Sequence, residues 1–302
     1  MAMPTLLDIA KANGRDGVAD LISETSKAVP EVTMGFARTI KGLNYKTLVR
    51  TGLPTVGFRN ANEGAAATKG TYENRLVETY IFNPRWTCDK AVADASEDGA
   101  AGYIAMEASA IMEAAFQWLG AQFFYGTSND SKGFPGLLAA VDTTNMVYDA
   151  TGSTSNTGSS VWAVKFGPKD VAWVYGLNGQ LSLSDPSEAP YYDGTNYFTA
   201  YWQELLAYPG LQVGNTRCIG QIKNLTEQTN KMLTDAMVYE LLAKFPVGGP
   251  PDVLFMNRRS LKQLRASRTA TNATGVPAPL PTEVGGIPIA VTDSILSTEA
   301  IA

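Results

Sequence analysis

The chain has 302 residues, of which 45% are apolar, and a formal net charge of −5 at pH 7. It contains no histidine, which excludes Ser-His-Asp and Cys-His triads, the HExxH zinc helix and metal sites built on imidazole. The acidic balance argues against wrapping nucleic acid as the main task, because proteins that do so usually carry a basic excess.

Two further features of the composition bear on the class of protein. Charged residues make up 18% of the chain, below the roughly 25% of an average soluble domain. Together with 28 glycines, this low fraction suits a surface that becomes mostly interface, and it suits a mesophilic enzyme with few surface charges equally well. The length permits one large domain or two ordinary ones with a buried core.

Cysteine usage and the first residues bear on where the protein is found. Cys88 and Cys218 stand far apart and form no CxxC motif, so we expect no zinc site and find no sign of an oxidising compartment. The start lacks the basic and apolar regions of a secretory signal, and no run is long enough to span a bilayer. We expect a protein made in the cytoplasm that stays soluble until it assembles, with no membrane association.

The N-terminal segment, Pro4–Leu43, is thin in apolar residues. Helices are expected near Thr5–Ala12 and Gly17–Ala28, and Pro30 is expected to end the second one. With so little apolar surface of its own, the segment is predicted to be an arm that lies on something else.

Between Asn44 and Asp89 the sequence predicts a long two-stranded ribbon. The outgoing arm Tyr45–Arg59 and the returning arm Thr71–Phe82 have the Thr, Val, Leu, Tyr, Ile and Phe content of strands. The joining stretch Asn60–Gly70 has no large apolar side chain. Because an isolated hairpin is only marginally stable in water, we expect a neighbouring molecule to cover the ribbon. The feature points to assembly rather than catalysis.

A long helix is predicted over Glu97–Tyr125. Ser96 is the expected N-cap, Glu97 and Asp98 lie in the first turn, and Gly126 provides the C-terminal stop. At ~1.5 Å per residue, such a helix is on the order of 40 Å long and would act as a spine. Its apolar face recurs at spacings of three and four, at Ile104, Ala108, Ile111, Ala115, Leu119 and Phe123.

The rest of the chain divides into a β-rich region and an alternating one. Strands are expected over Val161–Tyr175, Leu177–Leu183 and Thr216–Leu225, with an aromatic stretch at Tyr191–Gln212 and a loop at Thr151–Ser160. The last third predicts helix, strand, helix and strand in turn. These are Asp235–Phe245 capped by Thr234, Asp252–Met256, a helix to about Arg265 capped by Asn257, and Gly286–Thr292.

Two groups of side chains carry competing interpretations. An aromatic cluster lies near Asp185, Glu188, Asp193 and Glu204, and aromatic platforms with paired carboxylates occur in glycoside hydrolases, although packing in a core or interface is favoured. One helix is basic, with Arg258, Lys262 and Arg265 on one face. This face could contact nucleic acid, but we favour a face that is solvated or forms salt bridges to an acidic neighbour. The members of the aromatic cluster are Tyr191, Tyr192, Tyr197, Phe198, Tyr201, Trp202 and Tyr208.

Two stretches match known binding motifs only in part, and we expect each to be a structural loop rather than a binding site. Gly64–Gly70 carries Lys69 but does not match GxxxxGK[ST], so nucleotide binding is not supported. Pro277–Pro281 lacks the PxxP spacing and is expected to be a stiff loop.

The order of these elements resembles the Hong Kong 97-type fold of tailed-bacteriophage major capsid proteins. Phe82–Ser96 resembles the return from the extended loop into the spine helix. Ala114–Tyr125 with Gly126, followed by Gly133–Leu138, resembles the end of that helix and the turn beyond it. Gly285–Asp293, after the strand and helix of Asp252–Leu264, resembles the closing part of the axial domain.

The resemblance implies an α+β fold with four parts. These are an N-terminal arm (1–43), an extended β-hairpin loop (44–90), a peripheral domain with the spine helix and a β-rich insertion (91–225), and an axial domain with the C-terminal segment (226–302). The strands of Val161–Leu225 depart from the simplest members of the family, so the strand order there stays open. Covalent lysine–asparagine crosslinking, used by a few relatives, is not carried over to Lys69.

The resemblance also implies contacts with identical copies and no catalytic, cofactor or metal site. The contact residues expected in the extended loop are Arg59, Asn60, Glu63, Lys69, Tyr72 and Arg75. Those expected in the axial domain are Arg258, Arg259, Lys262 and Arg265.

Two functions follow as hypotheses. The first is a structural protein that forms pentamers and hexamers and closes them into an icosahedral shell around double-stranded DNA, which it binds without sequence specificity. By resemblance, its further partners would be a separate scaffolding protein, a portal and a decoration protein, and it would reside in the virion of a bacterial virus. The alternative is a carbohydrate-binding or hydrolysing protein that uses the aromatic region.

Overall fold

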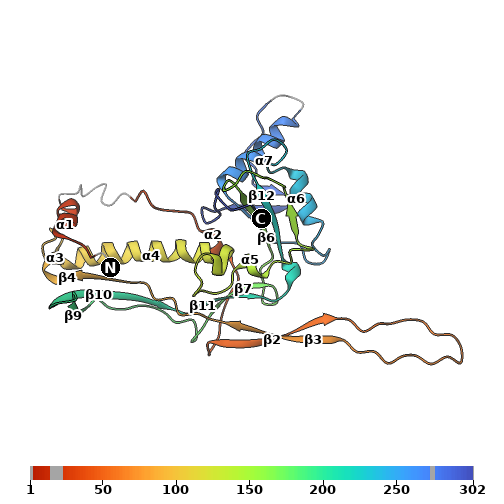
Figure 1. Cartoon of the computed structure of the whole chain (residues 1–302), viewed down its shortest axis with the longest axis horizontal. Helices are drawn as coiled ribbons and strands as arrows, with labels where there is room; N and C mark the ends of the chain where they lie inside the picture. The colour runs from red at the N-terminus through yellow and green to blue at the C-terminus, as the bar shows by residue number, and fades with distance from the viewer. Residues whose placement is uncertain (1–2, 14–22, 273–275, 302) are drawn as a thin grey trace.

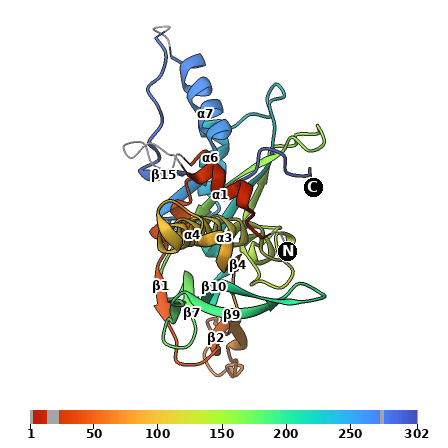
Figure 2. The same cartoon turned by 90° about the vertical axis from the view of Figure 1, so that its left-hand side faces the viewer.

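The computed structural model of the chain describes residues 3–13, 23–272 and 276–301. Figure 1 shows an elongated molecule with a long helix running along it, a compact sheet-and-helix part at one side and a ribbon projecting beyond both. Figure 2, along the helix, places strands β9 (Ser187–Tyr192) and β10 (Tyr197–Ala207) beneath it and helix α7 (Arg258–Ala270) above it. No helix within the described residues is both long enough and apolar enough to cross a bilayer.

The N-terminal arm carries two short helices and one strand. α1 (Leu6–Ala12) forms as predicted, and the Asp8 carboxylate accepts a hydrogen bond from the Thr5 backbone N at 2.9 Å. The helix predicted over Gly17–Ala28 lies partly outside the described residues, and residues 23–28 are not helical. Pro30 does not end a helix but begins α2 (Pro30–Met34), because its fixed φ and missing N–H suit a first turn. β1 (Ala37–Thr39) follows.

The ribbon consists of β2 (Asn44–Gly52) and β3 (Thr71–Glu78), which pair antiparallel from Asn44↔Glu78 to Arg50↔Tyr72. The prediction of a two-stranded ribbon is confirmed, but the paired part is shorter than the predicted arms. Residues 53–70 form the tip without strand pairing. The chain after Glu78 leaves the ribbon, and β4 (Arg85–Asp89) pairs instead with β10 (Tyr197–Ala207).

The spine helix α4 spans Gly99–Tyr125, 27 residues, and confirms the predicted long helix. Its start differs from the prediction. Gly99 has φ 72, and its N donates to the Ser96 carbonyl at 3.0 Å, so the backbone turns sharply there and Ser96 is not the N-cap. Asp98 occupies the N-cap position, and its side chain makes no capping hydrogen bond to the first turn. Gly126 ends the helix as predicted, with φ 53, and a Cβ there would lie 2.0 Å from the Gly136 N.

A six-stranded sheet forms the compact part, in the order β14-β15-β13-β6-β12-β5. Its predicted C-terminal strands are confirmed, and the Thr234 and Asn257 side chains cap α6 (Asp235–Leu242) and α7 (Arg258–Ala270) as expected. α7 continues past the predicted end at Arg265. The strands are β5 (Val147–Asp149), β6 (Ser159–Val164), β12 (Ile219–Leu225), β13 (Val253–Met256), β14 (Glu283–Val284) and β15 (Ile287–Val291).

This sheet crosses the division predicted between residues 225 and 226. β6 pairs antiparallel with β13 through Val253↔Val164, and β12 pairs with β6. Strands expected to belong to a peripheral insertion therefore share hydrogen bonds with the strands of the axial part, because β6 reaches the middle of the sheet.

Two smaller sheets support the spine helix. One joins β4, β10, β8 (Leu181–Leu183) and β9 (Ser187–Tyr192), and the other joins β1, β7 (Val171–Tyr175) and β11 (Pro209–Val213). The remaining short elements are α3 (Lys90–Ala93), η1 (Gly126–Ser128), α5 (Leu137–Ala140) and η2 (Thr216–Cys218).

The main core lies where the C-terminal half of the spine helix meets the sheets. Phe123 stacks on Trp173 with ring centroids 5.3 Å apart, and Phe124 meets Phe255 edge-on at 5.7 Å. Tyr103 and Trp86 belong to a second, smaller cluster at the other end of the helix. Between the two clusters the helix has only partial cover, since Phe116 and Trp118 are 40% and 46% exposed.

Candidate assembly surfaces

The ribbon is fixed to the body by one of its two faces. Cross-strand partners point to the same side, so Tyr45 and Val77 lie on one face. Val77 is buried, the Tyr45 hydroxyl donates to Gln212, and the Arg38 guanidinium lies 4.5 Å from the Tyr45 ring centroid. These contacts hold the base of the ribbon and leave its other face free.

The outer face of the ribbon is exposed and partly apolar. Leu48, Tyr72 and Leu76 are 69%, 61% and 50% exposed, among basic side chains of Lys46 and Arg50 on the same face. In a chain that must fold in water, large apolar groups grouped on one exposed face mark an interaction surface.

The tip is shaped by its own hydrogen bonds. An Arg59 Nη donates to the Glu63 carbonyl at 2.8 Å, and the Asn60 N donates to the Glu63 carboxylate at 3.1 Å. The Thr68 hydroxyl donates to the Thr55 carbonyl at 2.7 Å across the loop. Beside this turn the Phe58 side chain is fully exposed.

The predicted loop contact residues thus lie in three places: the tip, the outer face of the ribbon and its opposite face. The structure brings Arg59, Asn60 and Glu63 together in the tip. Lys69 is exposed at the end of the tip, and Tyr72 lies on the outer face of the ribbon. Arg75 lies on the other face, half-buried, 4.0 Å from the Glu73 carboxylate.

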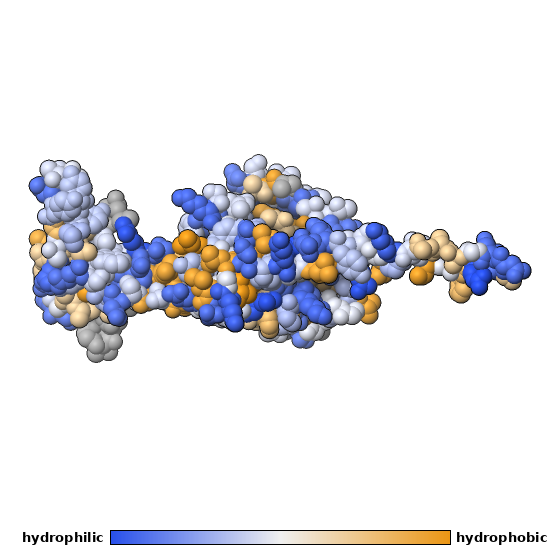
Figure 3. Space-filling model, turned by 90° about the horizontal axis from the view of Figure 1, so that it is seen from below, coloured by the Kyte–Doolittle hydropathy of each residue, from blue (hydrophilic) through white to orange (hydrophobic). Residues whose placement is uncertain are grey.

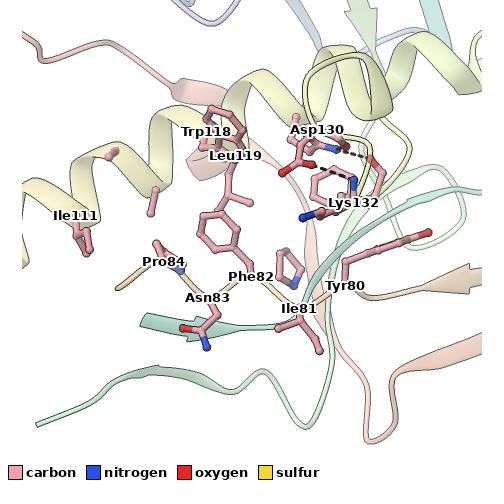
Figure 4. Close-up of a pocket in the computed structure, with 16 residues that line it drawn as sticks. Tyr80, Ile81, Phe82, Asn83, Pro84, Ile111, Trp118, Leu119, Asp130 and Lys132 are labelled. Carbon is pink, nitrogen blue, oxygen red and sulfur yellow. Dashed lines mark hydrogen bonds between the residues drawn. The ribbon is translucent and has the colours of Figure 1, made fainter. Parts of the chain in front are cut away.

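An apolar pocket of about 460 Å³ opens between the spine helix and the chain that returns from the ribbon. Figure 4 shows Phe82 directed toward the helix and Ile81 directed away from it. Ile81 is 73% exposed. Figure 3 shows that, seen from below, apolar side chains gather over the narrow middle of the molecule and on the projecting ribbon. The walls include Ile111, Ala115, Trp118 and Leu119 of the helix, Tyr80–Pro84, Phe134 and Pro209, with Asp130 and Lys132 also lining the pocket.

The basic helix α7 makes salt bridges within the chain, as favoured from the sequence. Arg258 Nε lies 3.9 Å from Asp293, and Lys262 Nζ lies 3.7 Å from Glu227. Arg258 and Lys262 remain largely exposed, with 81% and 77% of their side chains accessible.

The side chains of two other predicted contact residues on α7 donate hydrogen bonds to backbone carbonyl groups of the same chain. Arg259 donates to Thr157 and Ser297 at 2.7 and 2.9 Å, and Arg265 Nε donates to Ala278 at 2.8 Å. These two side chains hold neighbouring segments in place.

The aromatic region is built as a β-hairpin surface. The Tyr192 and Tyr197 rings pack against each other across β9 and β10, with centroids 4.9 Å apart and planes tilted by 39°. Glu188 pairs with Lys90, and Glu204 accepts a hydrogen bond from Asn83 at 3.3 Å. Asp193 accepts from two backbone N–H groups of the hairpin turn, which lowers its pKa. These three carboxylates bind groups of the same chain, so the structure favours packing over a carbohydrate site for the aromatic cluster.

The sequence analysis did not identify two carboxyl groups that the structure shields from water, Glu31 fully and Glu299 in part. Glu31 is completely buried, and Glu299 accepts hydrogen bonds from the Tyr125 and Ser160 hydroxyls at 2.6 and 2.8 Å. Burial raises the pKa of both groups. Nothing in the local sequence separates them from exposed glutamates, because segments distant in the chain bury them.

Comparisons with known proteins bear on these surfaces. A family model described as "Major capsid protein GP7" matches residues 11–302. A search of curated protein sequences found no match.

Solved structures with a similar fold include a chain from the near-atomic structure of bacteriophage Epsilon15. It has a TM-score of 0.77 and 20% identity, and the match covers 100% of this chain and 98% of that one. A chain from Mycobacterium phage Adephagia has a TM-score of 0.50 and 10% identity over 73% of this chain and 98% of its own. The α+β, Hong Kong 97-type fold expected from the sequence is confirmed.

Proposed function

The chain belongs to the family described as Major capsid protein GP7, and from this membership we propose how its own surfaces join identical copies into a shell. It is the major capsid protein of a tailed-phage head, a structural component of the virion and not an enzyme, and it assembles with copies of itself. The proposal concerns which residues make the contacts and what the shell contains.

The ribbon of one copy lies on the pocket beside the spine helix of the next. The ribbon offers a fully exposed Phe58 and the apolar outer face with Leu48 and Leu76, none of which its own body covers. The pocket offers a cavity of about 460 Å³ with apolar walls, and Trp118 and Ile81 are exposed there. Burying one phenylalanine side chain contributes about 1.5–3 kcal/mol, so a few such contacts favour association of the ribbon with the pocket.

Polar groups surround both apolar surfaces. Asp130 and Lys132 line the pocket, while the tip presents Lys69 with Arg59, Asn60 and Glu63. Charges of both signs on each side suit an interface with an apolar centre and a polar rim. Tyr72 contributes from the outer face, and Arg75 supports the ribbon from the opposite face.

The axial part surrounds the local symmetry axis of pentamers and hexamers. Arg258 and Lys262 make contacts between copies there because their side chains remain exposed, while Arg259 and Arg265 support them through bonds to the chain's own carbonyls. We assign 1–43 to the arm and 44–90 to the extended loop. The strands β5, β6 and β12 join 226–302 in the axial domain, and the rest of 91–225 forms the peripheral domain.

The remaining partners follow from the family resemblance. The shell is icosahedral and encloses double-stranded DNA, and the net charge of −5 suits a lining that does not grip the DNA. A separate scaffolding protein and a portal take part in assembly, with a decoration protein as a further partner on the outer face.

Deleting Asn60–Gly70 tests the role of the ribbon. We expect a folded chain that sediments as small species, and few or no shells in electron micrographs. The deletion removes residues 60–70 of the tip, and with them the turn beside Phe58 that the Glu63 hydrogen bonds shape. Phe58→Ser should weaken assembly in the same direction. Val247→Ser serves as the control, since Val247 is also fully exposed but lies outside the ribbon and the pocket. Normal shells from the deletion would refute the proposed role of the ribbon.

A further inference from the structure

Glu31, the second residue of α2, is buried without a partner. Its side chain is 0% exposed, and neither carboxylate oxygen has a hydrogen-bond partner among the described residues. An ionised carboxylate in such a place is strongly unfavourable, whereas the neutral acid is tolerated. The stability of the packing around Glu31 therefore depends on whether its carboxyl group is protonated.

The carboxyl group is held between two segments far apart in the sequence. A Cβ at Gly120 of the spine helix would lie 2.4 Å from Glu31 Oε1 and 2.4 Å from Ser294 Oγ. Only glycine leaves room for both groups against the helix. The Ser294 hydroxyl is also buried and without a hydrogen-bond partner among the described residues.

Backbone contacts fasten the arm at the same point. Ala28 N donates to Asp293 Oδ2 at 2.9 Å, and Asp293 N donates to the Ala28 carbonyl at 3.0 Å. Trp173 Nε1 of β7 donates to the Glu31 carbonyl at 3.1 Å. The arm thus joins the spine helix, the end of β15 and a strand of the smaller sheet at one place (Figure 1).

The charged surroundings of Glu31 come mainly from the C-terminal segment. Asp293 is the acidic neighbour there, and Arg258 Nε lies 3.9 Å from Asp293 Oδ1. The spine helix contributes Gly120, and β7 contributes the neutral Trp173. No basic side chain of the described residues forms an ion pair with Glu31.

We propose that Glu31 is a proton-controlled latch, which holds the N-terminal arm against the spine helix and the C-terminal segment while its carboxyl group is neutral. Ionisation places an unpartnered charge between these segments and weakens their contact. This goes beyond the contacts between copies, because the latch operates within one chain and sets whether its arm is held or released.

The direction of the pH dependence follows from the burial. Burial raises the pKa of Glu31, Asp293 raises it further, and the Ser294 and Thr292 hydroxyls offset part of the rise by proximity, although the structure gives neither a hydrogen bond to the carboxylate. A raised pKa means that the docked arm is most stable below the ordinary glutamate pKa. That stability is lost as the pH rises through the raised pKa.

Hydrogen exchange of the full-length chain tests the latch. Amide protection in residues 28–34, corrected for intrinsic rates, should fall between pH 5 and pH 8, by about tenfold for each unit by which the pKa is raised. Glu31→Gln keeps the shape without the charge and should hold the acidic level of protection throughout. Glu24→Gln, an exposed position on the same arm, should behave as the unaltered chain.

Two results would overturn the proposal. One is protection of residues 28–34 in the unaltered chain that stays constant from pH 5 to pH 8, a measurement that does not depend on any variant folding. The other is a fall in the Glu31→Gln chain equal to that of the unaltered chain.

Discussion

The Tyr125 hydroxyl, in the last turn of the spine helix, donates a hydrogen bond of 2.6 Å to the Glu299 carboxylate in the C-terminal segment. The same hydroxyl accepts a hydrogen bond from Leu296 N at 2.8 Å. One side chain thus ties residues 296–299 to the helix, across more than 170 positions of sequence.

Replacing Tyr125 by Phe should loosen this segment. The change leaves the half-buried Glu299 without one of its donors, and hydrogen bonds to charged groups contribute about 1.5–3 kcal/mol each. We expect a loss of about 1–3 kcal/mol in the free energy of unfolding, measured by urea denaturation. Tyr148→Phe is the control, because the Tyr148 hydroxyl has no hydrogen bond within the described residues. Equal effects from both variants would contradict the assignment.

Two phenylalanines of the spine helix should differ sharply in their effect on stability. Phe123 is fully buried against Trp173, so Phe123→Ala removes packing and leaves a cavity that costs about 3–5 kcal/mol. Phe116 is 40% exposed, and Phe116→Ala should cost the fold less than about 1 kcal/mol. Thermal or urea unfolding of the unassembled chains measures both. A large loss from Phe116→Ala would show that this face is packed within the chain.

The end of α7 is joined to the start of α6 by a two-pronged ion pair. Arg268 Nε and Nη2 lie 2.8 and 2.7 Å from the two Asp235 carboxylate oxygens, and each side chain is 31% exposed. A double-mutant cycle with Arg268→Ala and Asp235→Ala should give a coupling of about 0.5–1 kcal/mol, smaller at high salt. Arg268→Lys should lose most of it, because an ammonium group cannot make both bonds in one plane. A coupling that lysine preserves in full would speak against the two-pronged geometry.

The two cysteines should be unreactive in the folded chain. Burial raises the pKa of Cys88 to about 11, with Glu107 and Asp89 adding to the rise, and burial raises the pKa of Cys218 to about 12. Since the thiolate is the reactive form, alkylation at pH 8 should be slower by at least about 100-fold than in urea. Mass spectrometry after timed exposure to iodoacetamide gives both rates. Rapid labelling of either residue before unfolding would show that its site opens.

Capping offers a test of the corrected helix start. The Thr234 hydroxyl accepts a hydrogen bond from Met237 N at 3.3 Å, so Thr234→Ala should cost about 1 kcal/mol of stability. Ser96 lies before the turn at Gly99 and caps no helix, so Ser96→Ala should change stability by less than about 0.5 kcal/mol. Urea denaturation measures the stability loss of each variant. A loss from Ser96→Ala equal to that from Thr234→Ala would show that Ser96 caps the helix, as expected from the sequence.

Local chemistry determined much of this fold from the sequence alone. The apolar period of the spine helix, its stop at Gly126 and the caps Thr234 and Asn257 depend on residues within one or two turns, and the structure has them where they were expected. The ribbon was predicted for the same reason, since the strand-forming composition of its arms and the polar tip are local features. The order of these elements was enough to indicate the family.

The tertiary structure alone decided which distant segments meet. β6 pairs with β13, Arg259 turns inward to the Thr157 and Ser297 carbonyls, and Glu31 is buried against Gly120 and Ser294. Strand pairing and burial depend on partners tens to hundreds of residues away, which local propensity and periodicity do not encode. Polar residues such as Glu31 have the same local signature whether water or a packed helix surrounds them.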